Sequence, residues 1–244
     1  MTIAIFSDIH ANLPALTAFF KDIDQRKPDA IYCLGDLVGY NVWPNEVIRE
    51  IRHRGIATIA GNHDEKVKKI SAGDTSGKNY AYSLIGEDER NYLRTLPAHL
   101  RITFQLNNDQ LTLLLVHGSP RSIDEYLFEE TNEADLKAIL KAADADILCF
   151  GHTHKPYLRT VAINNDGHTQ YAHAINTGSV GKPKDGDPRG SYILLHINEN
   201  SSVQDKESVQ AEIIRFTYDV EAAAKAVEDS PLPDEFADML RKAY

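Results

Sequence analysis

Short apolar runs alternate with amphipathic segments in the first 60 residues. The runs at residues 3–6, 30–34 and 56–60 are too short for a stable helix, and they predict buried strands. Between them, residues 12–27 and 44–54 carry apolar side chains at helical spacing. This strand–helix–strand–helix–strand order predicts parallel strands with helices packed outside, as in an α/β fold.

The rest of the chain mixes helices with antiparallel hairpins. A helix is expected over residues 134–143, and the tail is predicted to be helical over residues 220–227 and again after Asp234. A loop rich in Gly, Pro and Lys covers residues 176–190. Further strands are expected at residues 100–106, 111–116, 147–150, 157–163, 168–175, 191–197 and 209–216.

Residues 65–97 differ from their surroundings. They contain charged pieces broken by glycine at 71–74, followed by a helical segment with Tyr80, Tyr82 and Tyr92. About 30 residues cannot build their own core, so we interpret the segment as a helical excursion within one domain. That domain is expected to span residues 1–244 and to end in helices at about 219–244. A substrate cap and a packed helical hairpin both fit the excursion.

Composition and charge narrow the class of protein. With 42% hydrophobic residues the chain can bury a sizeable core, and its formal net charge of −10 gives no general attraction to nucleic acid or anionic membranes. The chain runs directly into its first strand, leaving no room for a signal peptide, and no apolar run approaches the ~18 residues of a membrane span. Cys33 and Cys149 lie inside apolar runs and are expected to be buried thiols. We therefore expect a cytoplasmic protein.

Polar residues follow five of the predicted strands. In open α/β sheets, ligands bind outside the carboxyl ends of the strands. Asp8 and His10 would face one object if the strand continued, although Asp8 could instead cap the following helix. The strand ends carry Asp8 and His10, Asp36, Asn62 and His63, His117, and His152 and His154.

These side chains form a set of candidate metal ligands. Two Asp, one Asn and four His, with His63 beside them, suit two divalent ions bridged by one carboxylate. Zinc held by thiolates is excluded, because both cysteines lie upstream within the strands. The remaining histidines fall outside these motifs and are interpreted as solvated or structural, namely His53, His99, His168, His173 and His196.

The ordered series Asp-x-His, Gly-Asp, Gly-Asn-His-Asp, His and Gly-His-Thr-His, from Asp8 to His154, resembles the calcineurin-like metallophosphoesterase superfamily. The blocks Ser-Asp-Ile-His-Ala-Asn-Leu (7–13), Gly-Asp-Leu-Val-Gly-Tyr (35–40) and Asn-Thr-Gly-Ser-Val-Gly (176–181) are similar to a small prokaryotic phosphodiesterase-like subgroup. The resemblance implies a four-layer α/β/β/α sandwich of two mixed sheets.

The resemblance also implies roles for individual residues. A hydroxide bridging two metal ions would attack phosphorus, and His63 would act as the catalytic acid that protonates the leaving oxygen. The metals would be manganese, iron, zinc, nickel or cobalt, with manganese favoured. The implied ligands are Asp8, His10, Asp36 and His154 for one metal, and Asp36, Asn62, His117 and His152 for the other.

The chain departs from the Ser/Thr protein phosphatase branch after Asp36. The stretch at residues 37–40 lacks the Asp and Arg of that branch, so His63 lacks an orienting carboxylate, for which Asp64 is a possible substitute. Asn12 and Arg121 are candidates for contacting a phosphate oxygen. For three cations in the 176–190 loop, phosphate binding and simple solvation are equally compatible with the sequence: Lys182, Lys184 and Arg189.

We therefore expect a dinuclear metal-dependent phosphoesterase, in first place a phosphodiesterase acting on a small or nucleotide-like phosphate ester. A phosphomonoesterase or protein phosphatase is the alternative that the missing Asp and Arg disfavour. A nuclease would need a basic groove that the composition does not indicate. A metal-binding interaction scaffold is a non-enzymatic alternative, disfavoured because every ligand is present. The expected partner is a small-molecule phosphate ester, with no membrane and no nucleic acid.

Overall fold

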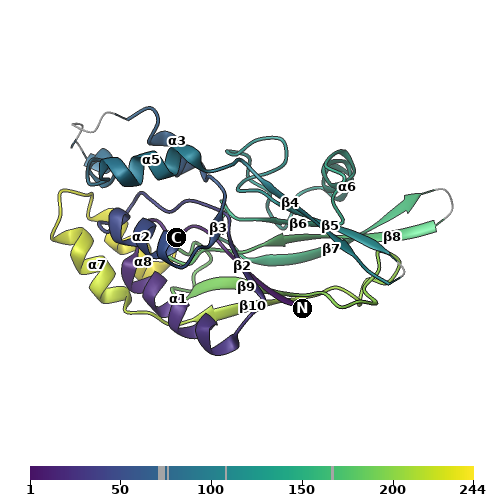
Figure 1. The fold of residues 1–244 in the computed structure, drawn as a ribbon. Coiled ribbons are helices and arrows are strands. Elements are labelled where there is room, and N and C mark those ends of the chain that lie inside the picture. Colours follow the sequence, from purple (N-terminus) through teal and green to yellow (C-terminus); the bar gives the residue numbers. More distant parts are fainter. Residues whose placement is uncertain (71–74, 76, 108, 166–167) are drawn as a thin grey trace.

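Two five-stranded mixed sheets face each other in the computed structural model, which describes residues 1–70, 75, 77–107, 109–165 and 168–244 (Figure 1). In spatial order the first sheet contains β10 (Gln210–Phe216), β9 (Gly190–His196), β1 (Thr2–Phe6), β2 (Ala30–Cys33) and β3 (Ala57–Thr58). The second contains β4 (Leu100–Gln105), β5 (Gln110–Leu115), β6 (Ile147–Phe150), β8 (His168–Asn176) and β7 (Tyr157–Asn165).

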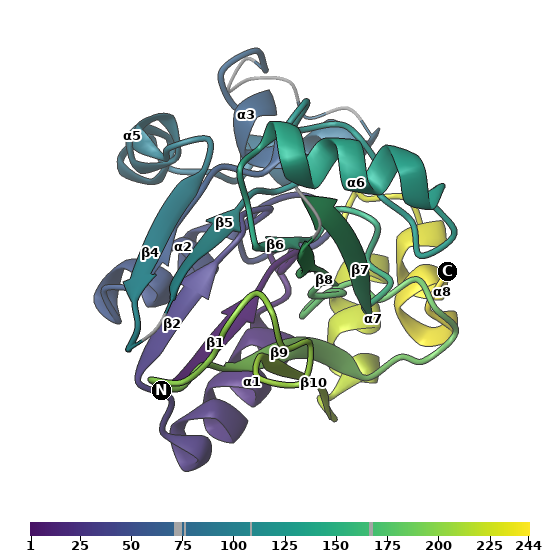
Figure 2. The same cartoon turned by 90° about the vertical axis from the view of Figure 1, so that its right-hand side faces the viewer.

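Helices cover the outer faces of both sheets, so the expected four-layer α/β/β/α architecture is confirmed. Figure 2 shows α1 (Leu13–Arg26) and α6 (Glu133–Ala142) on opposite outer sides of the two sheets. The first sheet is also covered by α2 (Pro44–His53) and α5 (Glu87–Thr95), and beyond them α7 (Val220–Glu228) packs on α8 (Glu235–Lys242). The short elements α3 (Asn62–Lys66), η1 (Gly77–Asn79) and α4 (Tyr80–Ser83) complete the helical layer.

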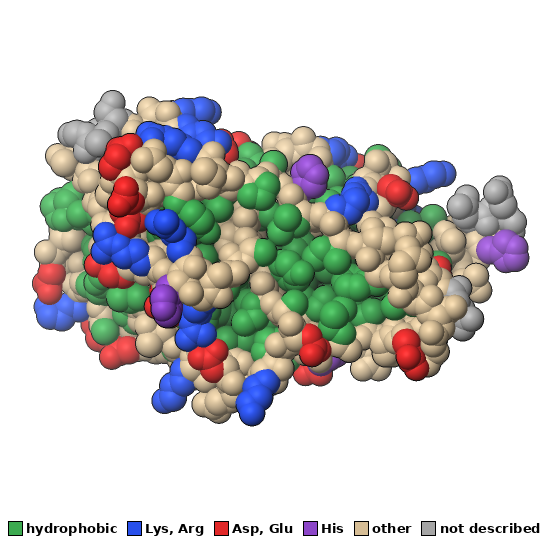
Figure 3. Space-filling model, viewed as in Figure 1, with side chains coloured by type: hydrophobic (Ala, Val, Ile, Leu, Met, Phe, Trp, Pro, Cys, Tyr) green, Lys and Arg blue, Asp and Glu red, His purple; other side chains and the backbone are tan. Residues whose placement is uncertain are grey.

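Side chains of β1 alternate between two cores. Ile3 and Ile5 enter the core between the sheets, whereas Ala4 and Phe6 enter the core beneath the helices. A strand buried on both faces has an apolar residue at every position, which explains the uninterrupted apolar run at the start of the chain. Figure 3 shows that hydrophobic side chains are also visible in the middle of one face of the molecule.

The sequence prediction was wrong about the length of the third strand. Of the expected residues 56–60, only Ala57–Thr58 form β3. The chain then bends, because Ala60 donates its N–H to the carbonyl of Pro97 at 2.8 Å rather than extending the ladder. The bend brings Gly61 against Asp36, where a Cβ on Gly61 would lie 2.1 Å from Asp36 Oδ1.

The 65–97 segment is helical where the structure describes it. Val67, Tyr82, Ile85 and Leu93 join the core beneath the helices of the first sheet, so the segment packs on the body of the protein. The glycine-broken piece at 71–74 lies outside the described residues. That the whole chain forms one domain stays a prediction.

The other predicted elements are present with small boundary shifts, and both cysteines are buried and free. The sequence did not predict that β9 would return to the first sheet and lie antiparallel between β1 and β10. Within the described ranges, no helix is both long enough and apolar enough to cross a membrane.

We expect Phe19→Ala to destabilise the protein strongly. Phe19 in α1 is fully buried, with its ring centroid 4.3 Å from that of Phe6 and 5.1 Å from that of Tyr192. Removing the ring leaves a cavity, which lowers the free energy of unfolding by about 3–5 kcal/mol. Urea unfolding of the metal-free protein measures this change. The control Phe128→Ala alters a ring that is 42% exposed and should change stability by less than about 0.5 kcal/mol. Equal losses of stability in the two variants would contradict the assignment of Phe19 to the core.

Candidate metal centre

The carboxyl ends of parallel strands from both sheets meet at one place. Strands β1, β2 and β3 are parallel in the first sheet, and β5 and β6 are parallel in the second. The loops that follow them are joined by main-chain hydrogen bonds, from Asp8 N to Gly35 O at 3.0 Å and from His10 N to Asp36 O at 2.9 Å. The second sheet has an equivalent bond from Gly151 N to the carbonyl of His117 at 2.9 Å.

Five of the predicted ligands have a left-handed backbone. Their φ angles lie between 50° and 66°, a region that costs residues with a Cβ roughly 1–2 kcal/mol each. Such strain persists where the surrounding structure fixes it, and it concentrates at functional sites. The five residues are Asp8, His10, Asp36, His152 and His154.

The polar side chains of these loops face one another. His154 Nε2 lies 3.1 Å from both His10 Nε2 and Asp8 Oδ1. Asp36 Oδ2 lies 3.6 Å from His10 Nε2 and 3.5 Å from His117 Nε2. Asp36 therefore lies between two groups of potential ligands, which is the position predicted for a bridging carboxylate.

Two more predicted ligands complete the cluster on the side of His117. Asn62 Oδ1 lies 3.2 Å from His117 Nε2. His152 belongs to a group with Asp36 and His117 whose potential ligand atoms all lie within 4.8 Å of one another. Two further groups of this kind contain Asp8, His10 and His154, and His10, Asp36 and His63. The structure thus brings all seven predicted ligands together, while their assignment to individual metals stays a prediction.

Three buried atoms of the cluster have no hydrogen-bond partner among the described residues: Asp8 Oδ1, Asp36 Oδ2 and His152 Nε2. The other oxygen of each carboxylate is bound, since Asp8 Oδ2 accepts from His152 N at 3.0 Å and Asp36 Oδ1 accepts from His63 N at 2.8 Å. A buried anionic oxygen without a partner is costly and calls for a cation. Carboxylate, imidazole and amide ligands fit first-row divalent metals.

Main-chain carbonyls fix the orientation of three imidazoles. Because a carbonyl oxygen only accepts, each Nδ1 carries a hydrogen, and in the neutral imidazole each Nε2 directs its lone pair into the cluster. The two lone pairs of His10 and His154, only 3.1 Å apart, also require a cation or a proton between them. The bonds run from His10 Nδ1 to Val38 O at 3.0 Å, from His117 Nδ1 to Leu34 O at 2.9 Å, and from His154 Nδ1 to Lys182 O at 2.5 Å.

Electrostatics keep both carboxylates ionised. Burial alone would raise the pKa of Asp8, but His154 and His10 outweigh that effect and hold its pKa well below the usual range. Burial is likewise outweighed at Asp36, where His117 and His63 lower the pKa. In return, Asp36 overcomes the effect of burial on His117 and raises the pKa of that imidazole to about 10. Without metal, a proton on His117 therefore supplies part of the missing positive charge, and metal binding has to release it.

His63 lies beside the cluster at the start of α3, and Asp64 does not orient it. The carboxylate of Asp64 instead accepts main-chain N–H bonds from Asp36 at 2.8 Å, Leu37 at 3.0 Å and Gly61 at 2.9 Å. The prediction that Asp64 could orient His63 in place of the missing carboxylate is therefore wrong. The buried carboxylate of Asp64 instead holds the turns around Asp36.

The hydroxyl of Tyr82 contacts His63 in place of a carboxylate. Tyr82 Oη lies 2.5 Å from His63 Nδ1, and Tyr82 is almost fully buried. Sequence reasoning noted Tyr82 as part of an aromatic helical segment but did not connect it with His63, because the two residues lie on separate short helices. The spacing of residues along the chain carries no signal for this contact.

Asn12 is buried as the N-cap of α1. Its Oδ1 accepts from Ala15 N at 3.1 Å, and its Nδ2 donates to Gly181 O at 2.8 Å. Both ends of the amide are thus used within the protein. The cap that the sequence offered as an alternative role for Asp8 is therefore supplied by Asn12, and the predicted phosphate contact of Asn12 has no direct support in these interactions.

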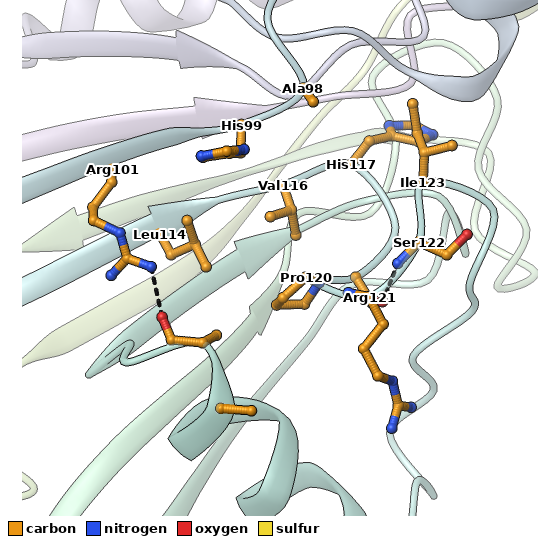
Figure 4. Close-up of a pocket in the computed structure, with 13 residues that line it drawn as sticks. Ala98, His99, Arg101, Leu114, Val116, His117, Pro120, Arg121, Ser122 and Ile123 are labelled. Carbon is orange, nitrogen blue, oxygen red and sulfur yellow. Dashed lines mark hydrogen bonds between the residues drawn. The ribbon is translucent and has the colours of Figure 1, made fainter.

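Arg121 lines a cavity of about 380 Å³ next to His117, but its guanidinium is engaged elsewhere (Figure 4). It bonds to Glu125 and to Asp135, the latter with Nη1 2.9 Å from Oδ1. In Figure 4 its side chain extends away from His117. The predicted contact between Arg121 and phosphate would have to replace these ion pairs.

The three cations of the 176–190 loop have different environments. Lys182 is only 1% exposed, and its Nζ lies 4.6 Å from the centroid of the Tyr40 ring. Lys184 is half-buried, whereas Arg189 is exposed and bonds to Asp187. The five histidines outside the motifs do not join the groups of potential metal ligands found among the described residues.

We expect Asp36→Asn to impair binding at both metal positions, because one substitution removes the negative charge shared by the two ligand groups. Metal per chain is measured by elemental analysis after dialysis against a series of Mn²⁺ concentrations, and the concentration that gives half occupancy should rise at least tenfold. Asp24→Asn serves as the control, since Asp24 is paired with Arg54 on the surface. Full metal content in Asp36→Asn would contradict the bridging role.

Comparison with known proteins shows the family to which the chain belongs. The model of the calcineurin-like phosphoesterase superfamily domain matches residues 1–200. The uncharacterized protein MJ0912 of Methanocaldococcus jannaschii is 30% identical over 253 residues, covering 98% of this chain and 96% of that protein.

Two solved structures share the fold along its whole length. The metallophosphoesterase from Sphaerobacter thermophilus has a TM-score of 0.78 and 26% identity, covering 100% of this chain and 99% of that one. The hypothetical protein PH1004 from Pyrococcus horikoshii also has a TM-score of 0.78, with 20% identity and coverage of 100% and 98%. The chain therefore belongs to the calcineurin-like phosphoesterase superfamily and is a metal-dependent phosphoester hydrolase.

Proposed function

We propose that the enzyme is a phosphodiesterase that uses two divalent metal ions, with manganese favoured, to hydrolyse a small or nucleotide-like phosphate ester. The observation that carries the proposal is the pair of bare, buried oxygens Asp8 Oδ1 and Asp36 Oδ2 among inward-facing imidazoles. The proposed ligands are Asp8, His10, Asp36 and His154 for one metal, and Asp36, Asn62, His117 and His152 for the other.

When bound, the metal ions supply Lewis-acid chemistry, lowering the pKa of water and offsetting negative charge on the phosphoryl group. The protein prepares this chemistry in advance. The left-handed turns at Asp8 and Asp36 and the carbonyls behind the imidazoles hold the ligand atoms in place before substrate arrives. Little reorganisation is then needed during the reaction.

His63 is the proposed proton donor to the leaving oxygen. In its protonated form, Nδ1–H donates to the Tyr82 hydroxyl, so that the proton on Nε2 is the one given up. Lys66 Nζ lies 3.4 Å from Nε2, where its ammonium can donate to this nitrogen only after His63 has given up the proton. Burial, reinforced by His10, holds the pKa of His63 well below its ordinary value, and the negative charge of a bound phosphate opposes this shift.

The charges on the His117 side of the site favour a diester over a monoester. A monoester carries more negative charge and benefits from further cations, yet Arg121 beside His117 is already paired with Glu125 and Asp135. The stretch at 37–40 supplies no arginine either. We further propose a single domain, a cytoplasmic location and a small phosphate ester rather than nucleic acid as partner. Asn12 and Arg121 are left out of the proposed machinery because both are engaged within the protein.

Hydrolysis of two chromogenic esters tests the proposed reaction. We expect turnover of bis-p-nitrophenyl phosphate with a higher kcat/KM than for p-nitrophenyl phosphate, loss of activity after chelation, and recovery when Mn²⁺ is restored. A preference for the monoester would instead establish a phosphomonoesterase. No turnover of either ester by protein shown to contain metal would contradict the proposal and favour the interaction scaffold.

We expect His63→Gln to retain metal and to lower kcat by about 10²–10⁴, most strongly for esters with poor leaving groups. Tyr82→Phe should give a smaller loss, on the order of tenfold, with the same dependence on the leaving group, because it removes one hydrogen bond to the donor. In the His63→Gln background, Tyr82→Phe should have no further effect. The control is Tyr80→Phe in the same helix; an equal loss in this control, or additive losses in the double variant, would rule out the positioning role.

A further inference from the structure

A second cavity opens directly beside His63. It has a volume of about 190 Å³, and its described lining comes from the loop after β2, from residues 63–70, from residues 78–82 and from helix α8. Figure 1 shows α3 and α8 at the same end of the molecule. Among its described lining residues are Tyr40, His63, Lys66, Lys78, Tyr82 and Phe236.

Tyr40 forms the wall between this cavity and the metal centre. Its ring centroid lies 4.9 Å from that of His10, 4.9 Å from that of His63 and 5.0 Å from that of Phe236. The side chain of the buried Lys182 packs over the same ring, with Nζ 4.6 Å from its centroid. A group bound in the cavity is therefore next to the proposed proton donor, on the side where a leaving group must depart.

The lining is both aromatic and basic. Tyr40, Tyr82 and Phe236 are its aromatic lining residues, and the side chains of Lys66 and Lys78 are exposed to solvent. No Asp or Glu occurs among the described lining residues, although the protein as a whole carries a formal net charge of −10. This local reversal of charge, combined with aromatic walls, selects a ring that bears an anion.

We propose that this cavity binds the leaving portion of the substrate, and that this portion is a nucleoside monophosphate. The inference rests on the proposed function, in which His63 protonates the leaving oxygen. The base would stack on the aromatic walls, as bases do on aromatic residues in other proteins. Its phosphate would pair with Lys66 and Lys78 through charge-assisted hydrogen bonds.

The reaction that follows from this placement is balanced. Water supplies an OH group to phosphorus while the bond between phosphorus and the leaving oxygen breaks. The leaving oxygen belongs to a hydroxyl group of the nucleotide, and it takes its hydrogen from His63 Nε2, which regains a proton from water. The products are a phosphomonoester of the other half of the substrate and a nucleoside monophosphate in the cavity.

Equilibrium binding tests the cavity without relying on turnover. Calorimetry would compare AMP, adenosine and ribose 5-phosphate, using the full chain with its metals and again after chelation. We expect AMP to bind at least tenfold more tightly than either fragment, in both forms of the protein. Phe236→Leu should weaken AMP and adenosine about equally, whereas Lys78→Gln should weaken AMP at least fivefold and leave adenosine unchanged.

Matched controls are Phe128→Leu and Lys141→Gln, which change an exposed ring and an exposed lysine elsewhere. Thermal unfolding verifies that Phe236→Leu is folded, and Lys78→Gln tests the proposal independently because its side chain is exposed. The proposal is overturned if both cavity variants bind AMP like the parent, or if AMP binds no better than ribose 5-phosphate.

The same data separate this inference from the proposed function. Hydrolysis of bis-p-nitrophenyl phosphate without AMP binding that responds to the variants would overturn the cavity assignment alone. AMP binding that follows the variants, in a protein that hydrolyses neither chromogenic ester, would support the cavity and contradict the proposed phosphodiesterase.

Discussion

Asp8 and Asp36 each use one carboxylate oxygen to hold the protein together and leave the other bare. The bound oxygens accept main-chain N–H groups of His152 and His63, so they fix the loops that carry the other ligands. The bare oxygens are buried among imidazoles, where an unpaired anion is unfavourable. The folded protein is therefore stabilised by positive charge at the junction of the two sheets. The left-handed turns and the pairing of the loops all serve this one arrangement.

Local patterns in the sequence were sufficient to predict an α/β fold and the gathering of the ligands, whereas the four-layer arrangement was implied by the resemblance to a known family. Apolar runs that end in Asp8, Asp36 or His152 mark buried strands, and parallel strands end at the same edge. Contacts between distant elements left no such pattern. The return of β9 to a position beside β1 depends on nonlocal pairing. Asp64 was misjudged because adjacency to His63 in sequence did not show that its carboxylate turns back to the main chain.

The proposed metal ligands and the proposed nucleotide cavity occupy different parts of this molecule. The proposed ligands come from loops at the ends of strands, where a small displacement would affect several of them together. The neighbouring cavity is built from short helices and from α8, near the end of the chain. His63 lies at the boundary, with its main chain bonded to Asp36 and its ring bonded to Tyr82. If the proposed cavity assignment holds, substitutions in the helical wall would alter which substrates the enzyme accepts while leaving the ligands untouched.

The loop after β8 has a consequence for the way the protein is made on the ribosome. Val180 and Gly181 donate N–H bonds to the carbonyls of Ser7 and Asp8, and Lys182 supplies the carbonyl that orients His154. Because Asp8 comes early in the chain, it is synthesised long before the residues that enclose it. The first strand leaves the ribosome without its neighbour β9, and the metal centre is completed late in synthesis. A nascent chain that stops before residue 182 would contain every proposed ligand and still lack the finished centre.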